Sequence, residues 1–156
     1  MGLRLPNLHE YEAAGIKIDA LTPQNEPETD QLGRMPASYM HPDFEMTFIR
    51  DYLTPLLRKE GIGTKVWIMD HNYAMWKRAK WMPDEPGFKK LVDGVAFHPY
   101  EGEAEMMSRL HDAHPEVDIY WTEAGTFLDE QYQKSWCQWS KTYTDAFANW
   151  VKCITI

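Results

Sequence analysis

The stretch Asp93-Gly94-Val95-Ala96-Phe97-His98-Pro99-Tyr100 joins a short apolar run to polar residues, and this arrangement decides the fold. Residues 94–97 have the length and composition of a buried β-strand, and the polar side chains follow where that strand should end. The same order recurs three more times along the chain. Strands are predicted over 16–22, 66–69 and 118–122, and they lead to Asn25 and Glu26, to Asp70-His71-Asn72 and to Glu123.

Helical patterns separate these predicted strands. An apolar stripe with helical spacing follows Pro42, meets Pro55, where we expect a kink, and ends near Gly61. Its members are Phe44, Phe48, Ile49, Tyr52, Leu53, Leu56 and Leu57, and a second stripe consists of Trp136, Trp139, Tyr143, Ala146, Phe147 and Trp150. Further helices are predicted over 7–14, 73–80, 104–113 and 134–151, and residues 154–156 look like the start of a fifth strand. Strands that alternate with helices form βα units and a parallel sheet with right-handed crossovers.

The fold class predicted from this pattern is α/β, with a single domain over residues 1–156. Four complete strands and a fragment make about half of an eight-stranded (β/α)8 TIM barrel, whose active sites lie just beyond the carboxyl ends of the strands. The alternative is a small open doubly wound sheet. No glycine-rich phosphate loop follows any predicted strand, which disfavours that alternative.

Composition excludes several classes of partner. The net charge is −8 at pH 7, from 16 basic and 24 acidic residues, which argues against nucleic acid or an anionic membrane surface. No apolar stretch approaches the ~20 residues of a membrane span, and the start of the chain has no signal-peptide pattern, so localisation is left open. Cys137 and Cys153 would lie ~24 Å apart on one helix, and we expect free, buried thiols.

Two glutamates carry the chemistry suggested by the sequence. They lie in Thr22-Pro23-Gln24-Asn25-Glu26-Pro27 and in Trp121-Thr122-Glu123-Ala124-Gly125. A retaining glycosidase needs two such acids, one to protonate the leaving oxygen and one to attack the anomeric carbon, with carboxyl groups ~5–5.5 Å apart. Strands three spacings apart would be ~14 Å apart on a flat sheet, so the sheet must curve for this pair to act together.

These segments resemble glycoside hydrolase family 30, which includes glucosylceramidases, β-1,6-glucanases and β-xylosidases. The resemblance places Glu26 after strand four of the family's barrel and Glu123 at strand seven. By this alignment the chain covers strands four to seven and the start of strand eight, without the accessory β-sandwich. The segments that carry the resemblance are Ala20 to Pro27, Arg50 to Leu56, Trp67 to Asn72, Asp93 to Tyr100 and Ile119 to Ala124. Pro99 stands where many relatives have Trp.

The resemblance also implies roles for individual residues. Glu26 would be the general acid/base and Glu123 the nucleophile of a double displacement on a β-linked oligosaccharide or glycoside, with no cofactor. Asn25 would hydrogen-bond the 2-hydroxyl of the sugar, and His98 and Tyr100 would line the floor of the site and orient Glu123. Asp70 and Asn72 could line the cleft or cap the next helix.

Two other functional classes compete with this interpretation. Asp70, His71, His98 and Glu123 are metal-ligand types at strand ends, but there is no His-x-His pair and the Asn-Glu-Pro segment would go unexplained, so we expect no metal. A non-catalytic truncated barrel that binds carbohydrate or a protein partner is the second alternative. Because a half-barrel exposes two edge strands and an apolar inner face, a homodimer or higher oligomer that completes the barrel is expected.

Overall fold

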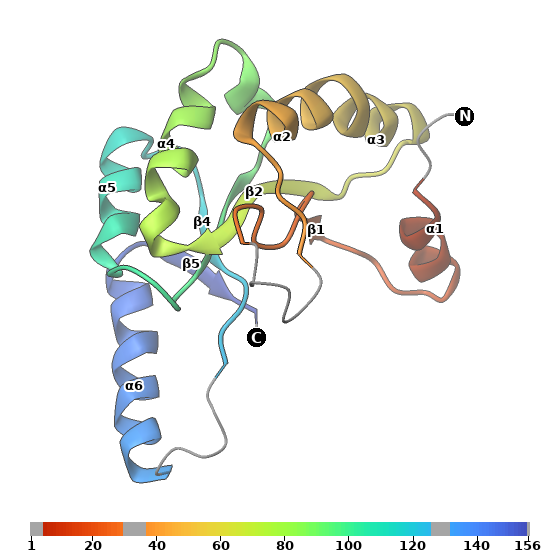
Figure 1. Ribbon diagram of the computed structural model, residues 1–156. Helices are drawn as coiled ribbons and strands as arrows, with labels where there is room; N and C mark the ends of the chain where they lie inside the picture. Colours follow the sequence, from red (N-terminus) through yellow and green to blue (C-terminus); the bar gives the residue numbers. More distant parts are fainter. Residues whose placement is uncertain (1–4, 30–36, 126–131, 156) are drawn as a thin grey trace.

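Five parallel strands form one sheet in the order β1-β2-β3-β4-β5 in the computed structural model, which describes residues 5–29, 37–125 and 132–155 (Figure 1). The order across the sheet is also the order along the chain, as successive βα units require. This confirms the prediction of an α/β, partial TIM barrel. The strands are β1 (Ala20–Leu21), β2 (Lys65–Asn72), β3 (Gly94–His98), β4 (Ile119–Trp121) and β5 (Val151–Ile154).

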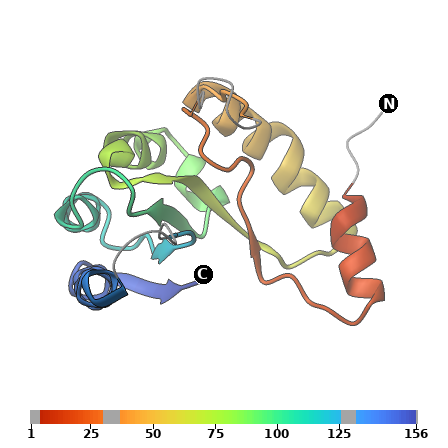
Figure 2. The ribbon, with the colours of Figure 1, turned by 60° about the horizontal axis from the view of Figure 1, so that its bottom comes forward.

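Helices connect the strands and ring one side of the curved sheet (Figure 2). They are α1 (Pro6–Ala13), α2 (Pro42–Phe48), the π-helix η2 (Ile49–Leu53), α3 (Thr54–Glu60), the 3-10 helix η3 (Tyr73–Met75), α4 (Trp76–Asp84), the 3-10 helix η4 (Phe88–Leu91), α5 (Glu105–Ala113) and α6 (Tyr132–Ala148). Among the described segments, no helix combines the length and the apolar character that crossing a bilayer demands.

The first strand is shorter than the predicted range of 16–22. Ladder pairing joins only Ala20 and Leu21 to Lys65 and Val66 of β2. The residues before β1 lie beside the segment that leads into β2, where the Thr64 hydroxyl donates to the Ile18 carbonyl. Among the described strands, β1 pairs only with β2. The apolar residues on either side of Ala20 and Leu21 therefore form no further ladder pairs with a described strand.

Pro55 distorts its helix without ending it. The chain runs through α2, η2 and α3 with a π turn over Ile49–Leu53, which ends two residues before the proline. Proline has no N–H to donate to the carbonyl one turn back, and a π turn is a common way to accommodate that loss. The helix then ends at Gly61, which adopts a left-handed conformation with φ of 68°.

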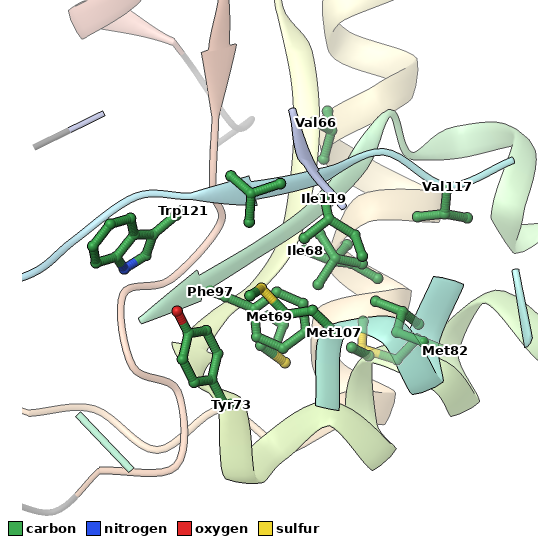
Figure 3. Close-up of a cluster of buried hydrophobic side chains, with 14 of the residues drawn as sticks. Val66, Ile68, Met69, Tyr73, Met82, Phe97, Met107, Val117, Ile119 and Trp121 are labelled. Atoms are coloured by element: carbon green, nitrogen blue, oxygen red, sulfur yellow. The ribbon is translucent and has the colours of Figure 1, made fainter. Parts of the chain in front are cut away.

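The hydrophobic core lies between the sheet and the ring of helices (Figure 3). Trp121 of β4 is fully buried and makes an edge-on contact with Tyr143 of α6, with ring centroids 5.2 Å apart. The strands contribute apolar side chains to this layer and the helices cover them. The other labelled core residues are Val66, Ile68, Met69, Tyr73, Met82, Phe97, Met107, Val117 and Ile119.

Gly94 of β3 leaves room for two aromatic rings to stack across this strand. Trp67 of β2 stacks on Tyr120 of β4, with ring centroids 3.9 Å apart, and Gly94 of β3 lies beneath the Tyr120 ring. A Cβ at Gly94 would lie 2.5 Å from Tyr120 Cε2, so any side chain there would separate the two rings. Glycine inside a strand therefore permits side chains of two non-adjacent strands to meet across β3.

Several apolar residues assigned to buried helical stripes are exposed instead. Phe44 is 70% and Tyr52 56% exposed, while Glu45 and Met46 are buried. On or near α6, Trp136, Phe147 and Trp150 are likewise exposed. Both cysteines are free, as expected, but the prediction that they are buried was wrong, because Cys137 and Cys153 are exposed.

Candidate active site

Four polar side chains meet where four strands end at the same edge of the sheet. Glu26 follows β1, Asp70 lies near the end of β2, His98 is the last residue of β3, and Glu123 follows β4. One carboxylate oxygen of Glu26, one ring nitrogen of His98 and one carboxylate oxygen of Glu123 all lie within 4.8 Å of one another. The curvature of the sheet thus brings together two acids from strands that are three positions apart.

Each glutamate has one specific partner at the site. His98 Nδ1 lies 3.1 Å from Glu26 Oε1 and forms a hydrogen bond with it. The Tyr100 hydroxyl donates to Glu123 Oε1 at 3.1 Å. His98 has no exposed surface, whereas Tyr100 is 46% exposed. Glu26 is therefore held by the buried imidazole of His98, and Glu123 is held by the partly exposed phenol of Tyr100.

Asp70 links the ends of four strands through its carboxylate. Its Oδ1 accepts from Thr122 Oγ1 at 2.6 Å and lies 3.1 Å from His98 Nε2, and its Oδ2 accepts from Thr22 Oγ1 at 2.6 Å. Thr22 follows β1 and Thr122 follows β4, so residues after non-adjacent strands contact one side chain. This network connects the strand ends beside Glu26 and Glu123.

A β-bulge aims the Asp70 side chain into this network. The register between β2 and β3 shifts between Met69 and His71, and both Met69 and Asp70 have positive φ, 75° and 49°. The Asp70 carbonyl accepts from the Glu26 backbone N–H at 2.9 Å, and Glu26 itself has φ of 44°. Left-handed conformations are uncommon for residues other than glycine, and they cluster at functional sites.

Hydrogen bonds shift the pKa of both Asp70 and His98 toward the charged form. Burial would raise the pKa of Asp70, but hydrogen bonds from His98, Thr122 and Thr22 outweigh it and lower that pKa. Burial would likewise lower the pKa of His98, but the interactions with Asp70, Glu26 and Glu123 together outweigh it and raise that pKa. At the mouth, burial and the Glu123 charge raise the pKa of Tyr100 to about 12, so its hydroxyl remains a donor at neutral pH.

A second buried network supports the loop that carries Glu26. Arg78 of α4 donates to Glu45 Oε2 at 2.5 Å, to Glu28 Oε1 at 2.7 Å and to the Met40 carbonyl at 2.9 Å. Glu45 Oε1 accepts from the Met69 backbone N–H at 3.1 Å. One arginine therefore connects the segment after Glu26, helix α2 and the bulge in β2.

The amino-acid sequence matches a known protein family over nearly its whole length. The Glycosyl hydrolase family 30 TIM-barrel domain matches residues 4–155. The chain belongs to glycoside hydrolase family 30. It is 31% identical over 159 residues to the endo-1,6-beta-D-glucanase of Neurospora crassa, covering 95% of this chain and 30% of that protein. It is 32% identical over 129 residues to the endo-1,6-beta-D-glucanase BGN16.3 of Trichoderma harzianum, covering 76% of this chain and 24% of that protein.

The solved structure of the endo-beta1,6-glucanase BT3312 shares the fold. It superimposes with a TM-score of 0.86 at 26% identity, covering 96% of this chain and 35% of that one. This family 30 chain thus spans about a quarter to a third of the length of these proteins. The resemblance inferred from its motifs is confirmed.

Three further residues named from the sequence, Asn25, Asn72 and His71, differ in exposure and in hydrogen bonding. Asn25 is exposed, and its backbone carbonyl accepts from the Gln24 side chain at 3.0 Å. Asn72 occupies the cap position of η3, but its side chain makes no capping hydrogen bond, and its buried Oδ1 has no partner among the described residues. His71, one of the alternative metal ligands, lies 3.4 Å from the Thr29 hydroxyl, and burial lowers its pKa.

Five residues whose side chains build the two networks were not predicted as parts of the site. They are Thr22, Thr122, Glu28, Glu45 and Arg78. The threonines stand directly beside the motifs, where a hydroxyl after a strand end could have suggested a role. Glu45 lies four residues before Ile49 and eight before Leu53, so it shares their buried helix face. A buried acid needs a hydrogen-bonding or positively charged partner, and this position could have indicated one.

Proposed function

We propose that this chain carries the catalytic pair of a retaining β-glycoside hydrolase, with Glu26 as general acid/base and Glu123 as nucleophile. The observation that supports this most is the separation of at most 4.8 Å between a Glu26 oxygen and a Glu123 oxygen. Retaining enzymes hold their carboxyl groups ~5–5.5 Å apart, whereas inverting enzymes need ~6.5–9.5 Å to admit a water. The short separation therefore favours double displacement.

The surroundings of each acid fit its role in the two steps. In the first step Glu123 attacks the anomeric carbon while Glu26 gives its proton to the leaving oxygen, and in the second Glu26 takes a proton from water. The hydrogen bond between His98 Nδ1 and Glu26 Oε1 holds the Glu26 carboxyl in place, and it can adjust as Glu26 loses and regains its proton. The Tyr100 hydroxyl donates to Glu123 and keeps this carboxylate pointed into the site.

Other polar residues are proposed to bind the substrate or to position the acids. Asn25, exposed next to Glu26, would hydrogen-bond the sugar 2-hydroxyl, a contact that strengthens in the transition state. Tyr100 is exposed enough to touch the sugar, and buried Asn72 offers an unpaired amide oxygen close to the strand ends. Asp70 and His98 are buried and act through Glu26, as positioning residues.

The substrate class we propose is a β-linked oligosaccharide or glycoside, with no cofactor. A panel of aryl β-glycosides, together with β-1,6-linked gluco-oligosaccharides, tests this class, since two relatives are named endo-1,6-beta-D-glucanases. Retention is tested by NMR of the first-formed product, which should carry the β configuration. If the wild type binds these sugars and cleaves none, the chain is instead a carbohydrate-binding protein.

Glu26→Ala should slow hydrolysis in a way that depends on the leaving group. With alkyl or sugar leaving groups, which need a proton, we expect a loss of about 10²–10⁴-fold in kcat/KM. With an acidic phenol such as dinitrophenol the loss should be much smaller, because that group departs without protonation. Steady-state kinetics on matched aryl and alkyl glycosides measure the difference. A uniform loss on every leaving group would contradict the acid/base role.

We further propose that copies of the chain associate into a homodimer or higher oligomer. Among the described strands, β1 pairs only with β2 and β5 only with β4, so both ends of the sheet offer unpaired backbone groups. Such edges are ready sites for pairing with another strand. Size-exclusion chromatography with light scattering should give a mass of at least twice 18.3 kDa at micromolar concentration. A stable monomer would refute this.

A further inference from the structure

We propose that Glu26, His98 and Glu123 form a binding site for a divalent transition-metal cation such as Zn²⁺, and that the bound cation excludes substrate. This goes beyond the proposed function, because the cation can bind whether or not the chain cleaves glycosides. The cation takes no part in hydrolysis here. It competes for the same three side chains that the reaction requires.

The spacing of the three ligand atoms is close to what zinc needs. Zinc holds nitrogen and oxygen ligands at ~2.0–2.2 Å in a tetrahedron, which puts neighbouring ligand atoms about 3.4 Å apart. His98 Nδ1 and Glu26 Oε1 are 3.1 Å apart, and no pair in the group exceeds 4.8 Å. The widest pair therefore has to close by at most about 1.4 Å. Movement of the Glu123 side chain, which is only partly buried, is sufficient for this.

The second ring nitrogen of His98 is already arranged as in a metal site. His98 Nε2 faces Asp70 Oδ1 at 3.1 Å, and Thr22 and Thr122 fix this carboxylate. Metal-ligating histidines commonly donate their other N–H to a carboxylate, which sets the tautomer and makes the ligating nitrogen more basic. With the proton on Nε2, the lone pair of Nδ1 points toward Glu26, and a cation can take the place of the proton between them.

The charge and ligand types select the kind of cation. Two carboxylates neutralise a dication, and one imidazole favours Zn²⁺, Cu²⁺ or Co²⁺ over Mg²⁺ and Ca²⁺, which prefer oxygen ligands and a higher coordination number. Three protein ligands leave one tetrahedral position for water. Because the cation occupies both acids, a sugar cannot be attacked or protonated while it is bound.

Calorimetric titration of the substrate-free chain with ZnCl₂ tests the proposal. We expect one zinc per chain in the wild type, and at least about tenfold weaker affinity in Glu26→Gln and in Glu123→Gln. Asp70→Asn should weaken affinity about 10–100-fold by releasing His98. Co²⁺ added in place of zinc should give the strong visible absorption of a tetrahedral site, and Mg²⁺ should not compete.

Two control variants separate this site from surface binding. Glu85→Gln removes an exposed acid. His9→Gln removes half of an exposed His9–Glu60 pair, whose atoms lie 2.6 Å apart and could hold zinc loosely. Both should bind zinc like the wild type. Equal affinity in the site variants and the wild type, or loss of binding in His9→Gln alone, would overturn the proposal.

Kinetics give a second and separable readout. On any glycoside that the chain cleaves, Zn²⁺ should raise the apparent KM without changing kcat, and EDTA should restore the original value. A chain that binds zinc at these residues yet cleaves nothing would leave the site intact and reject hydrolysis. A chain that cleaves glycosides but binds no zinc would reject the site alone.

Discussion

Glu123→Ala should lose about 10⁴-fold or more of its glycosidase activity, and external azide should restore part of it. The substitution removes the carboxylate that attacks the anomeric carbon, and a methyl group leaves space on that face of the sugar. A small anion can enter this space and attack in place of the side chain. Activated aryl β-glycosides are the substrates of choice, because their departure needs little help from Glu26.

The configuration of the azide product assigns the role of each acid. If Glu123 is the nucleophile, azide attacks from the vacated face and the product is the α-glycosyl azide, inverted relative to the substrate. In Glu26→Ala, azide would instead react with the glycosyl-enzyme and give the β-azide. NMR of the isolated products distinguishes the two. The opposite result would exchange the roles of Glu26 and Glu123.

Control proteins exclude trivial explanations for these rates. Glu85→Ala changes an exposed acid away from the strand ends and should keep wild-type activity with no response to azide. Equal hydrolysis by the wild type, Glu26→Ala and Glu123→Ala would indicate a contaminating enzyme. Circular dichroism of the variants should match the wild type, since both glutamates are only partly buried.

Local sequence patterns were sufficient for three of the five strands, and they singled out the two glutamates that we propose as the catalytic pair. β2, β3 and β4 lie close to their predicted positions because each is a short apolar run followed by polar residues. Glu26 and Glu123 could be named because their motifs stand directly after these strands. Their distance could not be predicted, because it depends on how the sheet curves and on contacts across it, such as the hydrogen bonds of Asp70 to Thr22 and Thr122.

The remaining features depend on contacts between distant parts of the chain. The bulge at Asp70 needs positive φ angles at Met69 and Asp70, and no local preference indicates such an angle at a methionine. The stripe predicted after Pro42 was right for Ile49, Leu53 and Leu57, which are buried. It was wrong for Phe44 and Tyr52, which are exposed, and the structure buries Glu45 on that face. That acid is acceptable in the core only because Arg78, 33 residues later, meets it.

Arg78→Met should be the most destabilising substitution in the support of the site, at about 3–5 kcal/mol of unfolding free energy. The Arg78 side chain is 4% exposed and that of Glu45 1%, so the change leaves a buried carboxylate without its cation. It also removes the donors to Glu28 and to the Met40 carbonyl, which hold the segment that follows Glu26. Urea denaturation of the wild type and the variant measures the difference.

The pH dependence of this loss identifies the charge as its cause. Burial raises the pKa of Glu45 even with Arg78 present, and without the arginine nothing comparable opposes that rise. A carboxyl with a higher pKa in the folded state binds more protons there, so stability falls as pH rises above the ordinary value of about 4.3. The deficit of Arg78→Met should therefore be larger at pH 7 than at pH 5.

A double variant and an exposed ion pair complete the test of the Glu45–Arg78 charge pair. Adding Glu45→Gln to Arg78→Met removes the buried charge but keeps an acceptor for the Met69 N–H, so the double variant should be more stable than Arg78→Met alone. Lys80→Met breaks the Lys80–Asp84 pair on the same helix, which is exposed, and should cost less than about 1 kcal/mol. If the double variant were no more stable than the single one, and the deficit did not change with pH, Arg78 would act through packing. The supporting network would then be held by the shape of the arginine side chain rather than by its charge.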